Sequence, residues 1–171
     1  MNNSIEPTNK NVRIDDLQQQ FAVLKAANHI AHLLGKTNVL EQAIEPLINE
    51  FIDLVQAECG SIQLLRPGSQ QTQRTLVRKC THGECGFDNR LEDQITGWIL
   101  KHRSSLLTND IGAHTKLGAA AKRYASISSL LAVPIMQHDH VIGVVNLIRV
   151  QPTSPFTNQH VEMTTALAHC R

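Results

Sequence analysis

The length and composition of the chain indicate one globular domain. Its 171 residues suffice to bury a core around one sheet, and 42% hydrophobic with 18% charged residues is typical of neither a disordered nor a fibrous protein. The 16 basic and 15 acidic side chains nearly cancel and form no long basic run, which argues against nucleic-acid binding. No apolar run reaches the roughly 18 residues of a membrane span, and the first residues lack a signal-peptide pattern, so a cytoplasmic location is expected.

The N-terminal part predicts a disordered lead-in followed by a helix. Residues 1–10 are polar and aperiodic, and a single domain is expected over residues 11–171. Apolar residues recur at spacings of three and four from Ile14 to Ala31, which is typical of a coiled-coil seam. Asn28 takes an a-type position in that seam, where a polar residue can set the register of a dimer. The alternative is a surface helix packed on its own domain.

The next segments predict a helix and two strands. Asn38 and Glu41 resemble a capping box, and the apolar pattern from Leu40 to Val55 indicates an amphipathic helix, in which Pro46 is expected to cause a kink or a broken turn. Residues 61–65 and 74–80 then predict two antiparallel strands joined by a turn through Pro67-Gly68.

The second half of the chain predicts a hairpin between helical segments. A loop that contains glycine leads to a short helix over 96–102, a strand over 105–108, and loop and helix over 109–128. Two apolar runs, 130–136 and 141–148, flank a short polar turn and indicate a β-hairpin, with Pro134 at a bulge or an edge. A last helix is expected from Thr157, with Val161, Thr164, Leu167 and Ala168 on one face, and the chain is expected to stop inside it.

Several local strings, in this order, resemble the GAF domain family. Ile95-Thr96-Gly97-Trp98-Ile99 and residues 106–111 are similar to two consecutive family segments. Residues 124–135 resemble the stretch that enters the central strand of the family, and residues 141–147 with 155–157 resemble its closing hairpin and the start of its final helix. The resemblance runs from about residue 20 to residue 170.

The resemblance implies an α+β fold with three α/β/α layers. Its central antiparallel sheet would have about six strands, with the terminal helices on one face and the loops and short helices of a ligand pocket on the other. GAF domains bind cyclic nucleotides, tetrapyrroles, haem, metal centres or small metabolites, and many only mediate dimerisation, so the fold does not select the ligand.

The chain departs from three specialised subclasses of this family. Members that bind cyclic nucleotides carry Asn-Lys, Phe and Asp-Glu, and of the matching positions (149–150, Phe156 and 160–161) only Phe156 agrees. The region that would attach a bilin, near residues 113–128, contains His114 and no cysteine. Free methionine sulfoxide reductases need thiols where this chain has Thr96 and a crossover without cysteine, so an enzyme is not expected.

The cysteines offer one unusual string. Four cysteines are too few and too scattered for a disulfide-stapled secreted scaffold, so reduced thiols are expected. Cys80, His82 and Cys85 lie within six residues and are candidate ligands for zinc or iron, or Cys80 and Cys85 could form a reversible disulfide. The more common interpretation is that cysteines on a loop are simple small residues, and no metal site is assigned.

The remaining pocket candidates come from the elements around the expected site. Trp98 could stack on a flat ligand or pack in the core, Tyr124 has the same two interpretations, and Ser128 and Asn146 could point polar atoms inward. The expected ligand-binding residues are Cys80, His82, Ile95, Thr96, Trp98, His114, Tyr124, Ser128 and Asn146.

The expected function is that of a non-catalytic sensory or regulatory GAF domain. It would bind an unidentified small molecule, form a homodimer through its terminal helices, and signal to an effector domain of the same protein, such as a histidine kinase, cyclase, phosphatase or transcription activator. No cofactor is assigned. The alternatives are a structural dimerisation module without a ligand, and a Cys/His metal or redox sensor.

Overall fold

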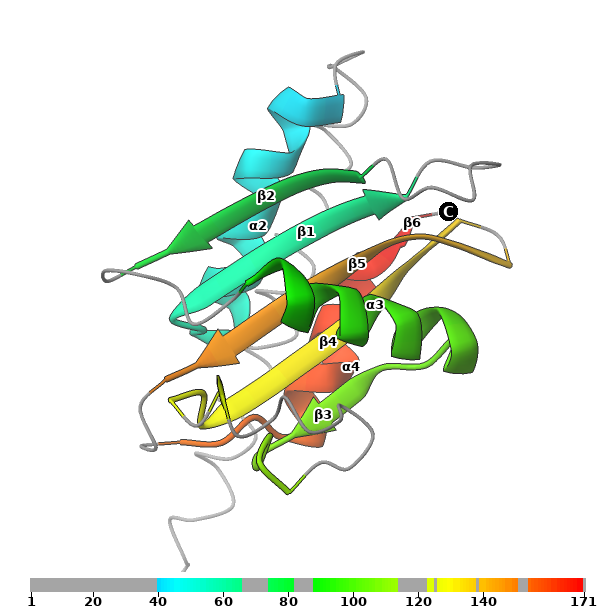
Figure 1. The fold of residues 1–171 in the computed structure, drawn as a ribbon. Coiled ribbons are helices and arrows are strands. Elements are labelled where there is room, and N and C mark those ends of the chain that lie inside the picture. Colours follow the sequence, from blue (N-terminus) through cyan, green and yellow to red (C-terminus); the bar gives the residue numbers. More distant parts are fainter. Residues whose placement is uncertain are drawn as a thin grey trace, which may run out of the picture.

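An antiparallel sheet with helices on both faces organises the chain (Figure 1). The structure is a computed structural model, and it describes residues 40–65, 74–81, 88–113, 123–124, 126–137, 139–150 and 154–170. The predicted lead-in, the first helix with Asn28, and the turn through Pro67-Gly68 lie outside the described residues.

Five antiparallel strands form the body of the sheet, in the order β2-β1-β5-β4-β3. Their bounds are β1 Cys59–Leu65, β2 Arg74–Cys80, β3 Leu106–Thr108, β4 Ser129–Gln137 and β5 His140–Arg149. The two residues of β6, His169–Cys170, pair with β4 in parallel and bring the sheet to six strands. The predicted meander and hairpin are therefore confirmed, as is the antiparallel sheet.

Three described helices cover the two faces of this sheet. Helices α2 (Leu40–Val55) and α4 (Asn158–Ala168) lie behind it in Figure 1, and α3 (Asn89–His102) lies in front. This arrangement confirms the expected three-layer α+β fold. No described helix has both the length and the apolar character that crossing a membrane requires.

Strand alternation divides the core into two layers. Leu131, Val133 and Leu147 pack with α2 and α4, whereas their neighbours Leu130 and Ile148 pack under α3. Because successive side chains of a strand point to opposite faces, a strand covered on both sides buries both sets. The central strands are therefore largely apolar on both faces, apart from a few buried polar residues.

Helix α2 packs closely on β1. Its buried residues follow a helical spacing: Ile44, Ile48, Phe51, Ile52 and Val55. A Cβ added at Gly60 would lie 2.8 Å from Cδ1 of Ile48, so the glycine permits the close approach. The helix continues from Leu40 to Val55 through Pro46, so the broken turn is absent, while the alternative of a kink stays a prediction. The packing of residues on both sides of Pro46 against the sheet offsets the backbone hydrogen bond that proline removes.

Helix α3 begins seven residues earlier than predicted. Asp88 caps it by accepting a hydrogen bond from the Leu91 N–H at 2.8 Å, and Leu91, Ile95 and Ile99 bury one face. The helix starts at Asn89 because this cap and the spacing of these apolar residues together stabilise a longer helix. At its other end Arg103 adopts the left-handed conformation, with φ of 50°, and donates its N–H to the Ile99 carbonyl.

The last two elements differ in one respect from the prediction. Helix α4 begins directly after Thr157, as expected, and Thr164, Leu167 and Ala168 are buried. The helix ends at Ala168, however, and His169–Cys170 continue as β6, so the expectation that the chain stops inside a helix is wrong.

Pro134 lies on β4 between the residues that pair with β3 and those that pair with β6, next to a register shift at Ile135/Met136. The missing N–H of proline is tolerated at such a local edge.

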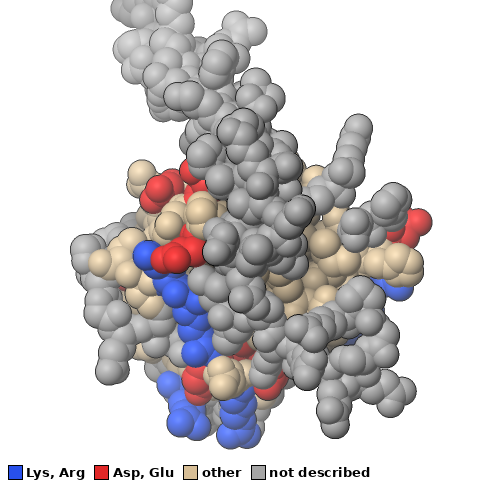
Figure 2. Space-filling view, turned by 90° about the horizontal axis from the view of Figure 1, so that it is seen from above, with Lys and Arg blue, Asp and Glu red and all other residues tan. Residues whose placement is uncertain are grey.

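Charged side chains line the β2 edge of the sheet. Figure 2 views the molecule from this side and shows basic and acidic side chains next to one another. Lys79 of β2 pairs with Glu45 of α2, with 3.3 Å between Nζ and Oε1. Charges on an edge strand oppose the addition of further strands.

Candidate functional site

Four polar side chains are buried together between α3 and the sheet. Ser61 and Gln63 come from β1, Asn146 from β5 and Thr96 from α3; we call these four residues the polar cluster. The first three are 0% exposed and Thr96 is 5% exposed. Buried polar groups are normally hydrogen-bonded, so their partners decide whether the cluster is complete.

Two polar atoms of the cluster have no partner. Thr96 donates its hydroxyl to Oε1 of Gln63, and Nδ2 of Asn146 donates to the Ser61 hydroxyl at 3.2 Å. Nε2 of Gln63 and Oδ1 of Asn146 are buried without a hydrogen bond. A buried unsatisfied group destabilises a fold by about 1–3 kcal/mol. The cluster thus carries two open hydrogen-bonding positions.

The strand register brings the cluster together. Ser61 lies directly opposite Asn146, and Gln63 lies opposite Val144, so Gln63 is the diagonal neighbour of Asn146. On β4 the residue opposite Asn146 is Ala132, whose methyl group is the shortest side chain on that row. Two side-chain amides and a small neighbour therefore share one patch of the α3 face.

A bidentate ion pair between Glu92 and Arg78 lies next to the polar cluster. Glu92, one helical turn before Thr96, is 0% exposed, and both of its carboxylate oxygens bind Arg78 of β2. The distances are 3.1 Å from Nε to Oε1 and 2.5 Å from NH2 to Oε2. Arg78 also donates to Oδ1 of Asn89. This bidentate pair compensates both charges, and the hydrogen bond to Glu92 raises the pKa of Arg78.

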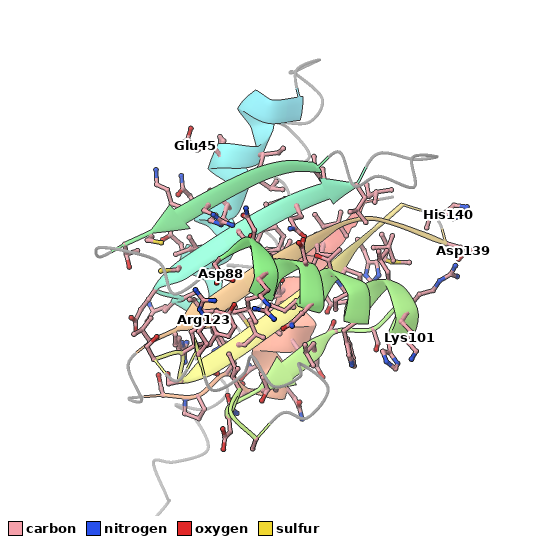
Figure 3. The ribbon with its side chains drawn as sticks, viewed as in Figure 1. Glu45, Asp88, Lys101, Arg123, Asp139 and His140 are labelled. Atoms are coloured by element: carbon pink, nitrogen blue, oxygen red, sulfur yellow. The ribbon has the colours of Figure 1, made fainter. Side chains whose placement is uncertain are left out.

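Tyr124 is tied to the start of α3. Its hydroxyl donates to Oδ1 of Asp88 at 2.6 Å, the same oxygen that caps the helix. Burial raises the pKa of Tyr124, and the bond to Asp88 raises it further. Burial alone would raise the pKa of Asp88, but the hydrogen bonds from Tyr124 and the Leu91 N–H outweigh it and lower the pKa. Arg123 lies at the same end of α3 (Figure 3). The predicted ligand residue Tyr124 thus joins the crossover to α3.

Two further candidates on α3 have clear positions. Ile95 is fully buried in the core under α3. Trp98 is half-buried and stacks on His102, with 4.4 Å between the ring centroids. Of the predicted pocket residues, the structure brings Thr96 and Asn146 into the polar cluster and places Ile95 in the core of the same layer.

Ser128 lies outside the polar cluster, beside a separate cavity. It lines a cavity of about 520 Å³ at the end of the sheet, whose other lining residues are Asn109, Asp110, Ile111, Gly112, Ile127 and Pro155. Its hydroxyl donates to the carbonyl of Arg149 at 3.0 Å. This cavity opens where β3 ends and β4 begins.

The cysteines differ from the expectation of reduced thiols, because Cys80 is disulfide-bonded. The number and scatter of cysteines indicate only whether a protein usually occupies a reducing or an oxidising compartment. Whether two particular cysteines form a disulfide depends on the distance between their sulfur atoms. Cys59 is a free, buried thiol directly opposite Cys80 on β1, and burial and the Glu58 carboxylate raise its pKa to about 11. His82, Cys85 and His114 lie outside the described residues. Within the described ranges no three His, Cys, Asp or Glu side chains are grouped to hold a metal ion.

Sequence reasoning missed half of the polar cluster. Ser61 and Gln63 alternate with buried Gly60 and Ile62 along β1, a pattern that normally indicates a solvent-facing side. No local signal marked these two residues, because their burial follows from the position of β1 between two other strands, with α2 on one face and Thr96 of α3 on the other. Glu92 was missed because the start of α3 was predicted too late.

Comparison with known proteins assigns the family. A family model described as a GAF domain matches residues 37–169, which is more than half of the chain. The chain therefore belongs to the GAF domain family. No curated protein sequence matches it.

Solved structures agree with this fold. The chain is similar to the GAF domain from Acinetobacter phosphoenolpyruvate-protein phosphotransferase (TM-score 0.63, 18% identity, 88% of each chain covered). It is also similar to free methionine-R-sulfoxide reductase from Neisseria meningitidis in complex with its substrate (0.62, 12%, 88% of this chain and 83% of that chain). A third is the GAF domain of a putative sensor histidine kinase from Pseudomonas syringae pv. tomato (0.55, 14%, 91% and 88%). At these identities the likeness shows the fold alone.

Proposed function

We propose that this chain is a non-catalytic regulatory GAF domain that binds a small molecule at the polar cluster. The observation that carries the proposal is the pair of buried amide atoms without a partner, Nε2 of Gln63 and Oδ1 of Asn146. A ligand that bonds to both would remove a cost that the empty domain bears.

The chemistry of the cluster supports binding and not catalysis. Its four members are two amides and two hydroxyls, and none of these groups titrates near neutral pH, so the cluster supplies no general acid or base. The adjacent carboxylate of Glu92 is fully engaged by Arg78. The pKa of the Cys59 thiol, raised to about 11, leaves only a small thiolate fraction at neutral pH, so its attack on a bound ligand would be slow there.

The position of the cluster suggests how binding would be transmitted. Thr96 connects α3 to β1 through Gln63, and β1 and β5 contact α2 on the opposite face. A ligand that changes the Thr96–Gln63 contact favours one arrangement of α3 over another, and it acts only through its different affinity for the two arrangements. We propose that a homodimer relays this difference through the terminal helices to an effector domain of the same protein.

The test is to identify the ligand in protein purified from its own host. Native mass spectrometry should find a bound mass that denaturation releases, and adding that compound back should raise the stability of the apo-protein. At a hundredfold excess over Kd the gain is about 2.7 kcal/mol. Absence of any bound mass, together with no thermal shift across nucleotides and metabolites, would contradict ligand binding and favour a structural dimerisation module.

A second candidate function is redox sensing, favoured by the disulfide of Cys80 beside the free thiol of Cys59. Thr81 donates its N–H to the Glu58 carbonyl at 2.9 Å, which makes the next pair, Cys59 and Cys80, a pair without mutual backbone hydrogen bonds. The Cα atoms of such pairs lie about 4.5 Å apart, within the range that a disulfide spans. The Cys59 thiolate would attack Sγ of Cys80, form a Cys59–Cys80 disulfide and release the present partner sulfur as a thiolate.

Disulfide mapping tests this candidate. Oxidised protein is incubated near pH 7 and at about pH 9, quenched with acid, and digested for mass spectrometry. The Cys59–Cys80 cross-link should form faster at the higher pH, because the thiolate fraction grows as pH approaches the Cys59 pKa of about 11. A Cys59→Ala variant is the control. Cys59 remaining unpaired at both pH values would rule out the exchange.

A further inference from the structure

We infer that the ligand of the polar cluster is uncharged and presents an amide-type group, with a hydrogen-bond acceptor and a donor side by side. The inference rests on the proposed function and deepens it by naming the ligand class. It starts from the two open positions, one on Gln63 and one on Asn146, both on side chains that are 0% exposed.

Each amide of the cluster uses one of its two polar atoms. Gln63 accepts from Thr96 and leaves Nε2, a donor, unused; Asn146 donates to Ser61 and leaves Oδ1, an acceptor, unused. A complementary ligand therefore needs an acceptor for Gln63 and a donor for Asn146. An amide supplies both on adjacent atoms.

The same ligand class follows if both side-chain amides are turned over together, whereas turning one alone would leave two donors or two acceptors. The hydroxyls of Ser61 and Thr96 can donate or accept, so both orientations keep the internal hydrogen bond. Turning both amides exchanges the open donor and the open acceptor, and an amide-type group matches this arrangement when it is itself reversed. Each side chain thus always leaves one atom for the ligand.

The surroundings favour a ligand without net charge. Among the described residues of the α3 face, the charged groups next to the cluster are Arg78 and Glu92, and they neutralise each other in a bidentate pair. The other members of the core around the cluster are apolar, among them Ile95, Val144 and Ala132. A charge brought into this layer would lose its hydration without gaining a counter-charge, which is costly.

The spacing suits one small group. Gln63 and Asn146 are diagonal neighbours on adjacent antiparallel strands, and such neighbours lie about 7 Å apart. Two amide side chains that converge from this distance can bond the same planar group. The methyl group of Ala132, opposite Asn146 on β4, occupies little of the space on that side.

The test compares neutral and charged forms of one ring. The probes are uracil and 2-pyrrolidone, which are neutral cyclic amides, and orotate, which is uracil with an added carboxylate. Binding to the apo-protein is measured by calorimetry and by the NMR signals of the side-chain NH₂ groups of Gln63 and Asn146. We expect at least one neutral amide to bind and to shift these signals, and orotate to bind at least tenfold more weakly than uracil.

Matched variants locate the binding. Ser61→Ala/Asn146→Leu removes one hydrogen-bonded pair together with its open atom, and should weaken binding at least tenfold, about the effect of one lost hydrogen bond. Thr164→Val is the control, because Thr164 is equally buried but lies on α4, on the opposite face. A Gln63→Met/Thr96→Val variant repeats the test at the other amide, should one double variant not fold.

Three results would overturn the inference. They are tighter binding of orotate than of uracil, unchanged binding in both double variants, and no binding of either neutral amide. If native mass spectrometry of the host protein still finds a ligand that lacks an amide-type group, the proposed function stands and only the ligand class is wrong. If no ligand of any kind is found, both fail.

Discussion

Arg149 connects three elements by a single buried side chain. Arg149 is only 7% exposed. Its NH2 binds the Val55 carbonyl at the end of α2 at 2.5 Å, and its NH1 binds the Ser154 hydroxyl at 3.0 Å and the Pro155 carbonyl at 3.3 Å. The group also lies over the Phe156 ring, 4.4 Å from its centroid. Burial lowers the pKa of Arg149. Arg149 and Phe156 occupy the region that carries the cyclic-nucleotide motif in other GAF domains, and here they contact each other.

Replacing Arg149 should therefore destabilise the fold without affecting the polar cluster. Arg149→Lys keeps the charge but cannot reach carbonyls on both sides, so we expect the free energy of unfolding to fall by about 2–3 kcal/mol. Urea denaturation measures the change, and Lys101→Arg, on the exposed end of α3, serves as the control. A loss below about 0.5 kcal/mol would show that these contacts do not stabilise the domain.

His160 makes the start of α4 sensitive to pH. Its Nδ1 accepts the Thr157 N–H at 3.0 Å, which requires an unprotonated Nδ1. Burial and then the nearby positive charge of Arg149 lower the pKa of His160 below its ordinary value of 6.5. Since protonation is harder in the folded state, this contribution to stability is complete above pH 6.5 and is lost as pH falls through the folded pKa.

A pH series of urea denaturation should show this loss. Between pH 7.5 and about pH 5 the wild type should lose more stability than His160→Gln, whose amide can still accept at the capping position but does not titrate. The difference between the two proteins isolates His160 from the other histidines. Parallel stability curves for the two proteins would count against a titrating cap.

At the scale of elements, two glycines in the strings that resemble the family have opposite roles. A Cβ at Gly143 of β5 would lie 2.5 Å from the Gln63 carbonyl oxygen of β1, whereas a Cβ at Gly97 of α3 would meet nothing within 4 Å. The backbone at Gly143 cannot move away from Gln63 without disturbing the pairing of β1 with β5. The same pairing sets the position of Gln63 in the polar cluster.

The two glycines thus form a matched pair of substitutions. Gly143→Ala should lower the free energy of unfolding by about 2–3 kcal/mol, because the added methyl group overpacks a strand pair. Gly97→Ala should raise it by about 0.5–1 kcal/mol, because alanine is the better helix former and the space is open. Thermal or urea denaturation of both variants decides the question, and equal effects would contradict this account.

At the scale of the whole molecule, the unpaired buried atoms of the polar cluster lower the free energy of unfolding of the domain without a ligand. Thr96→Val alone leaves Gln63 with neither amide atom bonded and should cost about 1–3 kcal/mol. Gln63→Met/Thr96→Val removes the pair and the open Nε2 atom together, and it should leave the free energy of unfolding unchanged or raise it by about 1 kcal/mol. Urea denaturation of the apo-protein compares the two. If the double variant is less stable than the single one, the cluster serves the fold and not a ligand.

Local patterns were sufficient for much of the fold. The apolar runs of β4 and β5 around a polar turn, the helical spacing from Leu40 to Val55 and the start of a helix next to Thr157 each involve neighbours in sequence, and each prediction is confirmed. Errors arose where a distant contact outweighs the local rule. Pro46 lies in an unbroken helix that packs on the sheet, and the end of the chain leaves α4 to pair with β4.

The residues of the candidate site likewise divide into those that the sequence predicted and those that only the structure revealed. Thr96 and Asn146 were predicted because they lie on elements that face the expected pocket, but their partners Gln63 and Ser61 were not. Ser128 was predicted for the pocket and lines a separate cavity, because it precedes β4 at the end of the sheet. Which polar atoms are paired depends on rotamers and on residues more than 30 positions apart, such as Gln63 and Thr96.

The sequence by itself determined the family, whose resemblance implied a sheet with helices on both faces, and it determined most of the helices and strands, because hydrophobic periodicity is a local property of the chain. Only the tertiary structure decided that Ser61, Gln63, Thr96 and Asn146 meet, that two of their polar atoms stay unpaired, and that Glu92 is buried against Arg78. These features depend on the register of the strands and on the position of α3 on the sheet, and packing across the whole domain sets both.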